Sequence, residues 1–127
     1  MWLSIDDKDT RPLYLQIISQ IKEQVSRGTL KTGDELPSVR ELAGSLGINL
    51  HTVRSAYLKL RDEGIIDLRL GRRAKIARLE GITVKGGTLT RLEQRAKEIV
   101  TDARLMGLSE EDIRALIERQ LDEKKEE

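Results

Sequence analysis

Several side chains that can donate and accept hydrogen bonds lie at the start of one predicted helix of this chain. His51, Thr52, Arg54 and Ser55 supply an imidazole, two hydroxyls and a guanidinium. Base edges in the major groove of DNA are suitable partners for such groups, and a helix enters that groove with its N-terminal residues at the bases. The same residues are equally typical of a solvated helix face. The neighbouring elements must therefore decide between the two interpretations.

The helix that carries these side chains is the second of two short helices joined by a tight turn. Ser38 and Glu41 have the spacing of a capping box, which predicts the start of the first helix, and Gly47 predicts its end. Asn49 is a favourable N-cap for the second helix, which ends at Gly64. This arrangement predicts a helix-turn-helix.

Apolar residues at helical spacing predict the core that positions this pair. In the second helix they recur at i, i+3, i+4 and i+7, at Val53, Ala56, Tyr57 and Leu60. A preceding helix starts with Pro12 as its first residue, stops before Gly28 and completes the core. Its predicted apolar face consists of Tyr14, Ile17, Ile18, Ile21 and Val25. The segment 2–5 reads as a brief extended stretch, with Trp2 either covering the core or joining a dimer contact.

A basic hairpin is predicted after the second helix of the pair. Ile66, Leu68 and Leu70 alternate on one face of its first strand, and Gly71-Arg72-Arg73 forms its turn. Residues 69–79 contain five basic side chains and no acidic one, which suits contact with DNA phosphates. A helix-turn-helix followed by such a hairpin is a winged helix, and DNA binding becomes the leading interpretation.

The composition of the chain limits which other classes of function are possible. The net charge of the 127 residues is only +1, but residues 1–80 hold 14 Lys and Arg against 11 Asp and Glu, whereas residues 81–127 hold 9 against 11. The chain has no cysteine and a single histidine, so we expect no disulfide, no metal site, no cofactor and no catalytic triad. It lacks a long apolar run and a signal-peptide pattern, and we expect a soluble, cytoplasmic protein that is not an enzyme.

The last third of the chain is predicted to form two helices of its own. Thr90 with Glu93 would open a helix that runs to about Met106, and Ser109 with Asp112 would cap the next one. We therefore divide the chain into a winged helix-turn-helix domain at 1–80, a linker at 81–89 and a helical segment at 90–127. The overall class is mainly α with a small β-hairpin.

This helical segment is too small to bury a stable core by itself. Two copies could form a four-helix arrangement, which predicts a dimerisation segment, whereas a hairpin folded back on its own winged helix is the alternative. The predicted dimerisation residues are Leu92, Ala96, Ile99, Val100, Ala103, Met106, Ile113, Leu116, Ile117 and Leu121.

The motifs of residues 10–79 resemble one known family. PLYLQIISQIKEQV, TGDELPSVRELAGSLGINLHTVRSAYLKLRDEG and a basic hairpin with Gly71 are similar to the winged helix of GntR-type bacterial transcription regulators. The short two-helix segment resembles the YtrA-like branch, in which such helices mediate dimers. The resemblance implies that Arg40, Asn49, His51, Thr52, Arg54 and Gly71 approach DNA.

Two positions depart from the family pattern. Leu50 replaces a frequent arginine that reads guanine, and it could touch a thymine methyl group instead. Gly71-Arg72-Arg73 replaces a common G-x-G, and the two charges predict more phosphate or minor-groove contact, together with Lys75.

The expected function is that of a homodimeric regulator, most simply a repressor, on double-stranded DNA. Its operator would be an inverted repeat with half-sites about one helical turn apart. A winged-helix protein-interaction module and a sequence-indifferent architectural DNA binder are the alternatives. Whether a small-molecule effector controls binding stays open. The resemblance allows one, but little chain is left after residue 80 to enclose a deep pocket outside a dimer interface.

Overall fold

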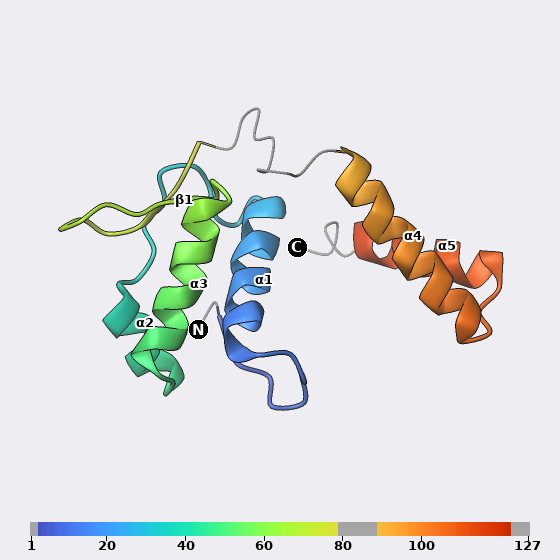
Figure 1. Cartoon of the computed structure of the whole chain (residues 1–127). Coiled ribbons are helices and arrows are strands. Elements are labelled where there is room, and N and C mark those ends of the chain that lie inside the picture. The colour runs from blue at the N-terminus through green and yellow to red at the C-terminus, as the bar shows by residue number, and fades with distance from the viewer. Residues whose placement is uncertain (1–2, 79–88, 123–127) are drawn as a thin grey trace. The chain divides into compact units, whose positions relative to one another are not determined.

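The computed structural model describes residues 3–78 and 89–122 of the chain (Figure 1). The chain divides into two compact units, residues 1–85 and residues 86–127. The first unit contains α1 (Leu13–Ser26), α2 (Val39–Leu46), α3 (Leu50–Asp62), β1 (Ile66–Asp67) and β2 (Lys75–Ile76). The second contains α4 (Leu89–Leu105) and α5 (Glu110–Asp122). This order of elements confirms the predicted class, mainly α with a small β-hairpin.

Local hydrogen bonds fix the helix-turn-helix of α2 and α3. The Ser38 hydroxyl accepts a bond of 3.1 Å from the Glu41 backbone N–H, and the Glu41 carboxylate accepts one of 3.1 Å from the Ser38 N–H. Gly47 ends α2 in the left-handed conformation, with φ of 68°. The Asn49 side chain then caps α3 by accepting a bond of 2.7 Å from the backbone N–H of His51. Both predicted caps are confirmed.

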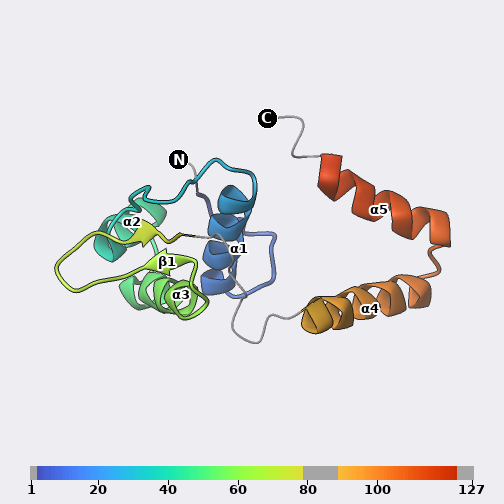
Figure 2. The same cartoon turned by 90° about the horizontal axis from the view of Figure 1, so that it is seen from above.

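The core of the first unit lies between α1 and α3, which run side by side in Figures 1 and 2. Ile17 and Ile21 from α1 and Val53 and Leu60 from α3 are fully buried. The predicted face of α1 was wrong at Tyr14, whose side chain is 39% exposed. Pro12 also lies one position earlier than predicted, since it is the N-cap of α1 rather than its first residue.

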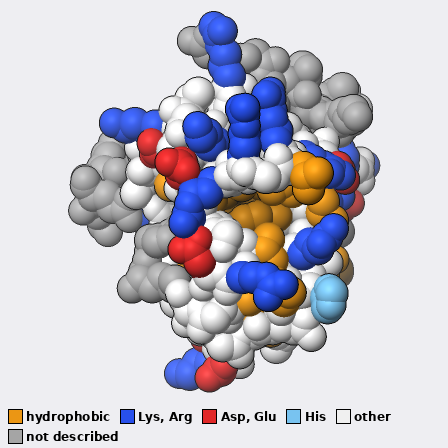
Figure 3. Space-filling model, turned by 90° about the vertical axis from the view of Figure 1, so that its left-hand side faces the viewer, with side chains coloured by type: hydrophobic (Ala, Val, Ile, Leu, Met, Phe, Trp, Pro, Cys, Tyr) orange, Lys and Arg blue, Asp and Glu red, His pale blue; other side chains and the backbone are white. Residues whose placement is uncertain are grey.

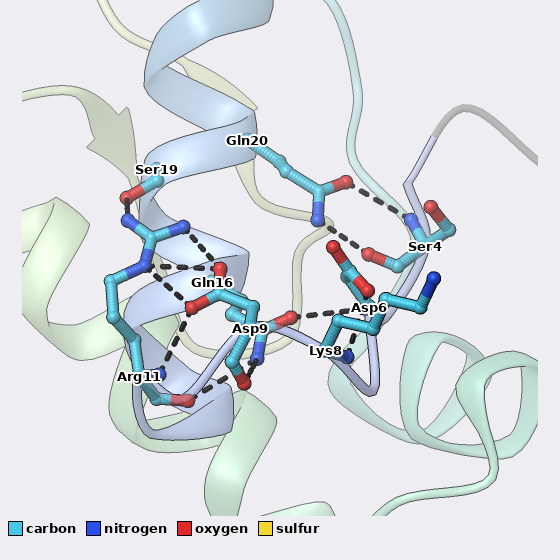
Figure 4. A network of polar contacts seen from close by, with 8 residues as sticks. All are labelled: Ser4, Asp6, Lys8, Asp9, Arg11, Gln16, Ser19 and Gln20. Carbon is cyan, nitrogen blue, oxygen red and sulfur yellow. Dashed lines mark hydrogen bonds and ion pairs between the residues drawn. The ribbon is translucent and has the colours of Figure 1, made fainter.

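A polar side chain, Gln16, takes a place in this core that the apolar pattern did not predict (Figure 4). Only 2% of Gln16 is exposed. Its carbonyl oxygen accepts a bond of 3.1 Å from the N–H of Asp6, and its amide donates one of 3.2 Å to the backbone oxygen of Arg11. Burial is tolerated because both ends of the amide are paired. Gln16 thereby fastens the segment before α1 to the helix.

The segment before α1 packs on the domain without forming a strand. Leu3 is buried in the core, and Ser4 exchanges two backbone-to-side-chain hydrogen bonds with Gln20 of α1. Arg11 pairs with Asp9, which lowers the pKa of the Asp9 carboxyl (Figure 4). The predicted extended segment 2–5 is therefore coil over residues 3–5, and Trp2 lies outside the described residues.

The hairpin has short strands and a third segment beside them. Ile66 pairs with Ile76 and Asp67 with Lys75 in antiparallel register. The backbone of Lys75 also forms an isolated antiparallel β-bridge with that of Glu35. The N–H of the buried Leu36 donates a bond of 2.8 Å to the carbonyl oxygen of Ala74. The segment before α2, which the sequence indicated only as a loop, is thus held against β2.

The alternation predicted for the first strand of the hairpin fails at its outer end. Ile66 is buried, Leu68 is partly buried, and Leu70 is fully exposed. β1 ends at Asp67, so the alternation of buried and exposed side chains along a strand does not continue as far as Leu70. From here on, "the wing" denotes residues 66–76. In Figure 1 its loop extends away from the three helices.

The second unit consists of α4, a turn at Gly107 and α5. The predicted capping box at Ser109 is confirmed, with bonds of 3.0 and 3.1 Å between Ser109 and Asp112, and it lowers the pKa of the Asp112 carboxyl. The predicted start at Thr90 was wrong, because α4 already begins at Leu89. The preceding residues of the predicted linker lie outside the described part of the chain.

The two helices of this unit diverge from their turn (Figure 2). Few of their side chains are covered. Among described residues 89–122, only Ala103 and Ile113 are buried. The large apolar side chains of the predicted dimerisation face are between 43% and 78% exposed; they are Leu92, Ile99, Met106, Ile117 and Leu121. Val100 and Leu116 are partly buried, and Ala96 is exposed. In the described ranges, no helix combines the length and apolar character needed to cross a bilayer.

Candidate nucleic-acid interface

The front of α3 has the exposure that the sequence predicted. His51, Arg54 and Ser55 are exposed, and Thr52 is partly buried. The back of the helix is fully covered, because Val53 and its apolar partners pack in the core. The helix therefore presents hydrogen-bonding groups from its first turns toward a groove-sized partner.

Asn49 and Leu50 sit at the entrance to α3 and are more constrained than their neighbours. The carboxamide oxygen of Asn49 is used to cap the helix, so a contact with a base would come through its amide N–H groups. Leu50 is partly buried and packs against the core. Only part of its surface is therefore available for the expected contact with a thymine methyl group.

The first turn of α2 forms the second edge of the interface. Arg40 is exposed there, next to the capping box. Between α2 and the wing lies a shallow groove whose apolar floor includes Val39, Tyr57 and Leu68. Figure 3 shows this face with apolar atoms in the middle and several basic side chains around them. Cationic groups around a hollow suit a polyanionic partner that is shaped like a rod.

Tyr57 ties α3 to the chain entering α2. Its hydroxyl donates a bond of 2.7 Å to the carbonyl oxygen of Pro37. Burial raises the pKa of the Tyr57 hydroxyl, and the nearby Glu41 carboxylate acts in the same direction. The hydroxyl therefore remains protonated and keeps donating well above neutral pH. Sequence periodicity identified Tyr57 as a core residue but gave no sign of this bond.

The wing brings most of the remaining basic residues to the same face. Gly71 forms its tip with φ of 76°, and the Arg72 N–H donates a bond of 3.1 Å to the Arg69 oxygen. Beside the tip lies an open groove of about 490 Å³. Its lining residues are Glu35, Asp67, Arg69, Arg72, Arg73 and Lys75. Arg69, which the family resemblance did not single out, is exposed and belongs to this surface.

Arg73 is exposed like Arg72, but its side chain is paired. Its guanidinium forms an ion pair of 2.8 Å with the Glu41 carboxylate and donates a bond of 3.4 Å to the carbonyl oxygen of Leu36. A second carboxylate, from Glu35, lies 4.0 Å from its Nε. The sequence indicated two equivalent arginines at the wing turn. It held no signal for this contact, because Glu41 and Arg73 are far apart in the chain.

The described residues offer no alternative centre for metal chemistry. No group of three or more His, Cys, Asp and Glu side chains within them is arranged to hold an ion. His51 is exposed on the front of α3. The surface built by α2, α3 and the wing is suited to hydrogen bonding and charge neutralisation.

Comparisons with known proteins agree with this geometry. The family model of the bacterial regulatory proteins, gntR family, matches residues 13–76. The HTH-type transcriptional repressor YtrA of Bacillus subtilis (strain 168) is 40% identical over 106 residues, which cover 84% of this chain and 82% of that protein. The matching family and this relative are transcription regulators rather than enzymes, as expected for this chain.

Solved structures extend the likeness over both units. The transcriptional antiterminator from Listeria monocytogenes EGD-e has a TM-score of 0.89 and 30% identity, covering 98% of this chain and 92% of its own. YtrA from Sulfolobus acidocaldarius, a GntR-family transcription factor, has a TM-score of 0.62 and 40% identity, covering 77% and 99%. The chain thus belongs to the GntR family of bacterial regulatory proteins, as a YtrA-like, DNA-binding transcription regulator with a winged helix-turn-helix fold.

Proposed function

We propose that the protein is a homodimeric repressor that binds an inverted-repeat operator in the bacterial cytoplasm. The exposed apolar faces of α4 and α5 support this proposal most directly. Residues as large as Ile99, Met106 and Ile117 lie on the surface of a unit in which very little is buried. Such a unit buries too little apolar area to offset the ordering of its backbone. A second copy of α4 and α5 supplies the missing surface in a four-helix arrangement.

The winged helix-turn-helix provides the contacts with DNA. His51, Thr52 and Arg54 enter the major groove and read base edges, and Asn49 joins them through its amide group. Arg40, Arg72 and Lys75 bind phosphates and set the register, while Gly71 lets the tip of the wing approach the backbone. Two copies place two α3 helices in successive major grooves, about 34 Å apart.

Repression follows most simply from steric occlusion of a promoter by the bound dimer. The name of the Bacillus subtilis relative, a transcriptional repressor, supports this direction of regulation. An activator would in addition need a surface that recruits the polymerase. No feature of the described residues favours such a surface over the ones assigned here.

Two measurements on the purified chain test the proposal. Sedimentation at micromolar concentration should give a dimer, and selection of bound sequences from random DNA should return an inverted repeat with half-site centres about 10 bp apart. Equal binding to random duplexes would instead identify an architectural DNA binder. A lack of binding to any duplex at low salt would favour a protein-interaction module and contradict the proposal.

A further inference from the structure

The two arginines that follow the tip of the wing are in different chemical situations. Both side chains are exposed, but Arg72 makes no ion pair with any residue of the described ranges. Arg73 turns back onto the first turn of α2, where Glu41 and the Leu36 carbonyl oxygen hold its guanidinium. The wing is thereby fastened to the helix-turn-helix at its outer end, beyond the last β-pair.

The carboxylate that holds Arg73 is itself fixed in place. The same oxygen of Glu41 that contacts Arg73 accepts the backbone N–H of Ser38, and this second bond belongs to an intact capping box. These bonds with Ser38, together with the charge of Arg73, lower the pKa of the Glu41 carboxyl. Glu41 is therefore ionised at neutral pH. An anion in a fixed position faces the guanidinium in the way a DNA phosphate would.

From this arrangement we infer that Glu41 and Arg73 form a latch that occupies one arginine of the wing and withholds it from DNA phosphates. The inference rests on the proposed DNA-binding role of the wing. In the intact latch, Arg72 supplies the phosphate contact of the turn, and Arg73 sets the position of the wing. Neutralising Glu41 releases Arg73 and adds a phosphate contact that lacks sequence information.

The latch predicts different effects for substitutions at two adjacent residues. Arg72→Ala flattens the dependence of log affinity on log salt by about 0.9 per protomer, the value expected for one lost phosphate contact. Arg73→Ala leaves this slope unchanged. Glu41→Gln steepens it by about 0.9 per protomer and tightens binding to unrelated duplexes about two- to fivefold at low salt.

Glu41→Gln is a suitable probe because glutamine also serves at the third position of a capping box, so α2 stays capped. Removing any negative charge strengthens DNA binding to some extent. Asp67→Asn is therefore the matched control, since Asp67 lines the same groove by the wing and forms no ion pair within the described residues. Thermal unfolding of each variant verifies that the domain is intact.

The binding titrations are run on the full chain with its selected operator and with an unrelated duplex, between 50 and about 300 mM salt, where such slopes are measurable. In the Arg73→Ala background, Glu41→Gln should have no effect beyond that of Asp67→Asn. The latch is overturned if Arg73→Ala flattens the slope as much as Arg72→Ala does, or if the effect of Glu41→Gln survives without Arg73. Failure of the wild-type chain to bind either duplex would overturn the proposed function, and the latch with it.

Discussion

The hydroxyl of Tyr57 on α3 lies 2.7 Å from the carbonyl oxygen of Pro37 and donates a hydrogen bond to it. The bond joins the helix that carries the base-reading side chains to the residue immediately before the cap of α2. Tyr57 is fully buried, so water cannot replace a lost partner there. The relative position of the two helices therefore depends on this buried polar contact as well as on apolar packing.

Replacing Tyr57 by phenylalanine should lower the free energy of unfolding by about 1–2 kcal/mol, because the buried acceptor on Pro37 is left without its donor. Urea unfolding followed by circular dichroism measures the change. Tyr14→Phe is the matched control, because Tyr14 is 39% exposed and its loss of a hydroxyl should change stability by less than about 0.5 kcal/mol. Equal effects of the two variants would contradict the structural role of the bond.

The same bond gives the stability a dependence on alkaline pH. Since burial raises the pKa of Tyr57 in the folded state, the unfolded chain loses this proton first as the pH rises above about 10. The stabilisation is thus complete below that pH and is lost progressively above it. The stability difference between wild type and Tyr57→Phe should shrink from pH 9 to about pH 11. A difference that stays constant over this range would show that the hydroxyl does not titrate with folding.

The capping box of α2 should contribute measurably to the stability of the first unit. Ser38→Ala removes the acceptor of the Glu41 N–H and should cost about 1 kcal/mol of unfolding free energy. Ser45→Ala, at an exposed position near the other end of α2, should change stability by less than about 0.5 kcal/mol. Chemical unfolding of both variants measures the two changes. Similar losses of unfolding free energy in Ser38→Ala and Ser45→Ala would contradict a specific contribution of the cap to stability.

Acid should weaken this cap, with a sign fixed by the pKa of Glu41. Its bonds with Ser38 lower that pKa in the folded state, so its stabilisation is present above the ordinary glutamate pKa of about 4.3 and is lost as the pH falls through the lower, folded value. Between pH 5 and about pH 3, wild type should lose more stability than Glu41→Gln, which has no carboxyl group to protonate. Parallel pH profiles would contradict the contribution of Glu41.

Signals confined to a few residues predicted the first unit well. The pair Ser38 and Glu41 and the N-cap Asn49 act through bonds to backbone groups two or three residues away, so the sequence alone specifies them. The buried back of α3 likewise follows from spacing along one helix. The helical period predicts which residues share a face, but Tyr14 shows that it does not determine how far the core extends along α1.

Features that join distant segments could not be predicted in this way. Gln16 is buried because the segment before α1 folds over it, and Leu36 is buried because β2 reaches back to it. The latch between Glu41 and Arg73 depends on the path of the wing after Gly71. Each of these contacts depends on how distant segments pack together, and the spacing of residues within one segment does not predict that packing. The predicted start of α4 at Thr90 failed for another reason, since a capping pattern also occurs inside helices.

Base reading and phosphate binding should separate cleanly between α3 and the wing. Arg54→Ala should reduce discrimination between the operator and a single-base variant by about 1–3 kcal/mol, because a side chain at a base edge carries sequence information. Arg72→Ala should weaken binding to operator and unrelated duplexes by the same factor. Fluorescence titrations against both duplexes measure the two ratios. If Arg54→Ala instead weakened binding to both duplexes by the same factor, Arg54 would contact phosphates rather than bases.

The apolar face of α4 and α5 should control assembly, and through it the affinity for a full operator. Ile117→Glu places a charge on that face and should shift the chain toward monomer at micromolar concentration, because an unpaired carboxylate would be buried between the two copies. Glu118→Gln, at the neighbouring exposed position, is the control and should leave the dimer intact. Analytical ultracentrifugation measures the assembly, and titration with one or two half-sites measures its effect on DNA binding. If α4 and α5 join the two copies, the wild-type chain should bind a duplex with two half-sites more tightly than a duplex with one. The Ile117→Glu variant should bind both duplexes with the same, weaker affinity per half-site. A dimer that survives this substitution unchanged would require a different interface.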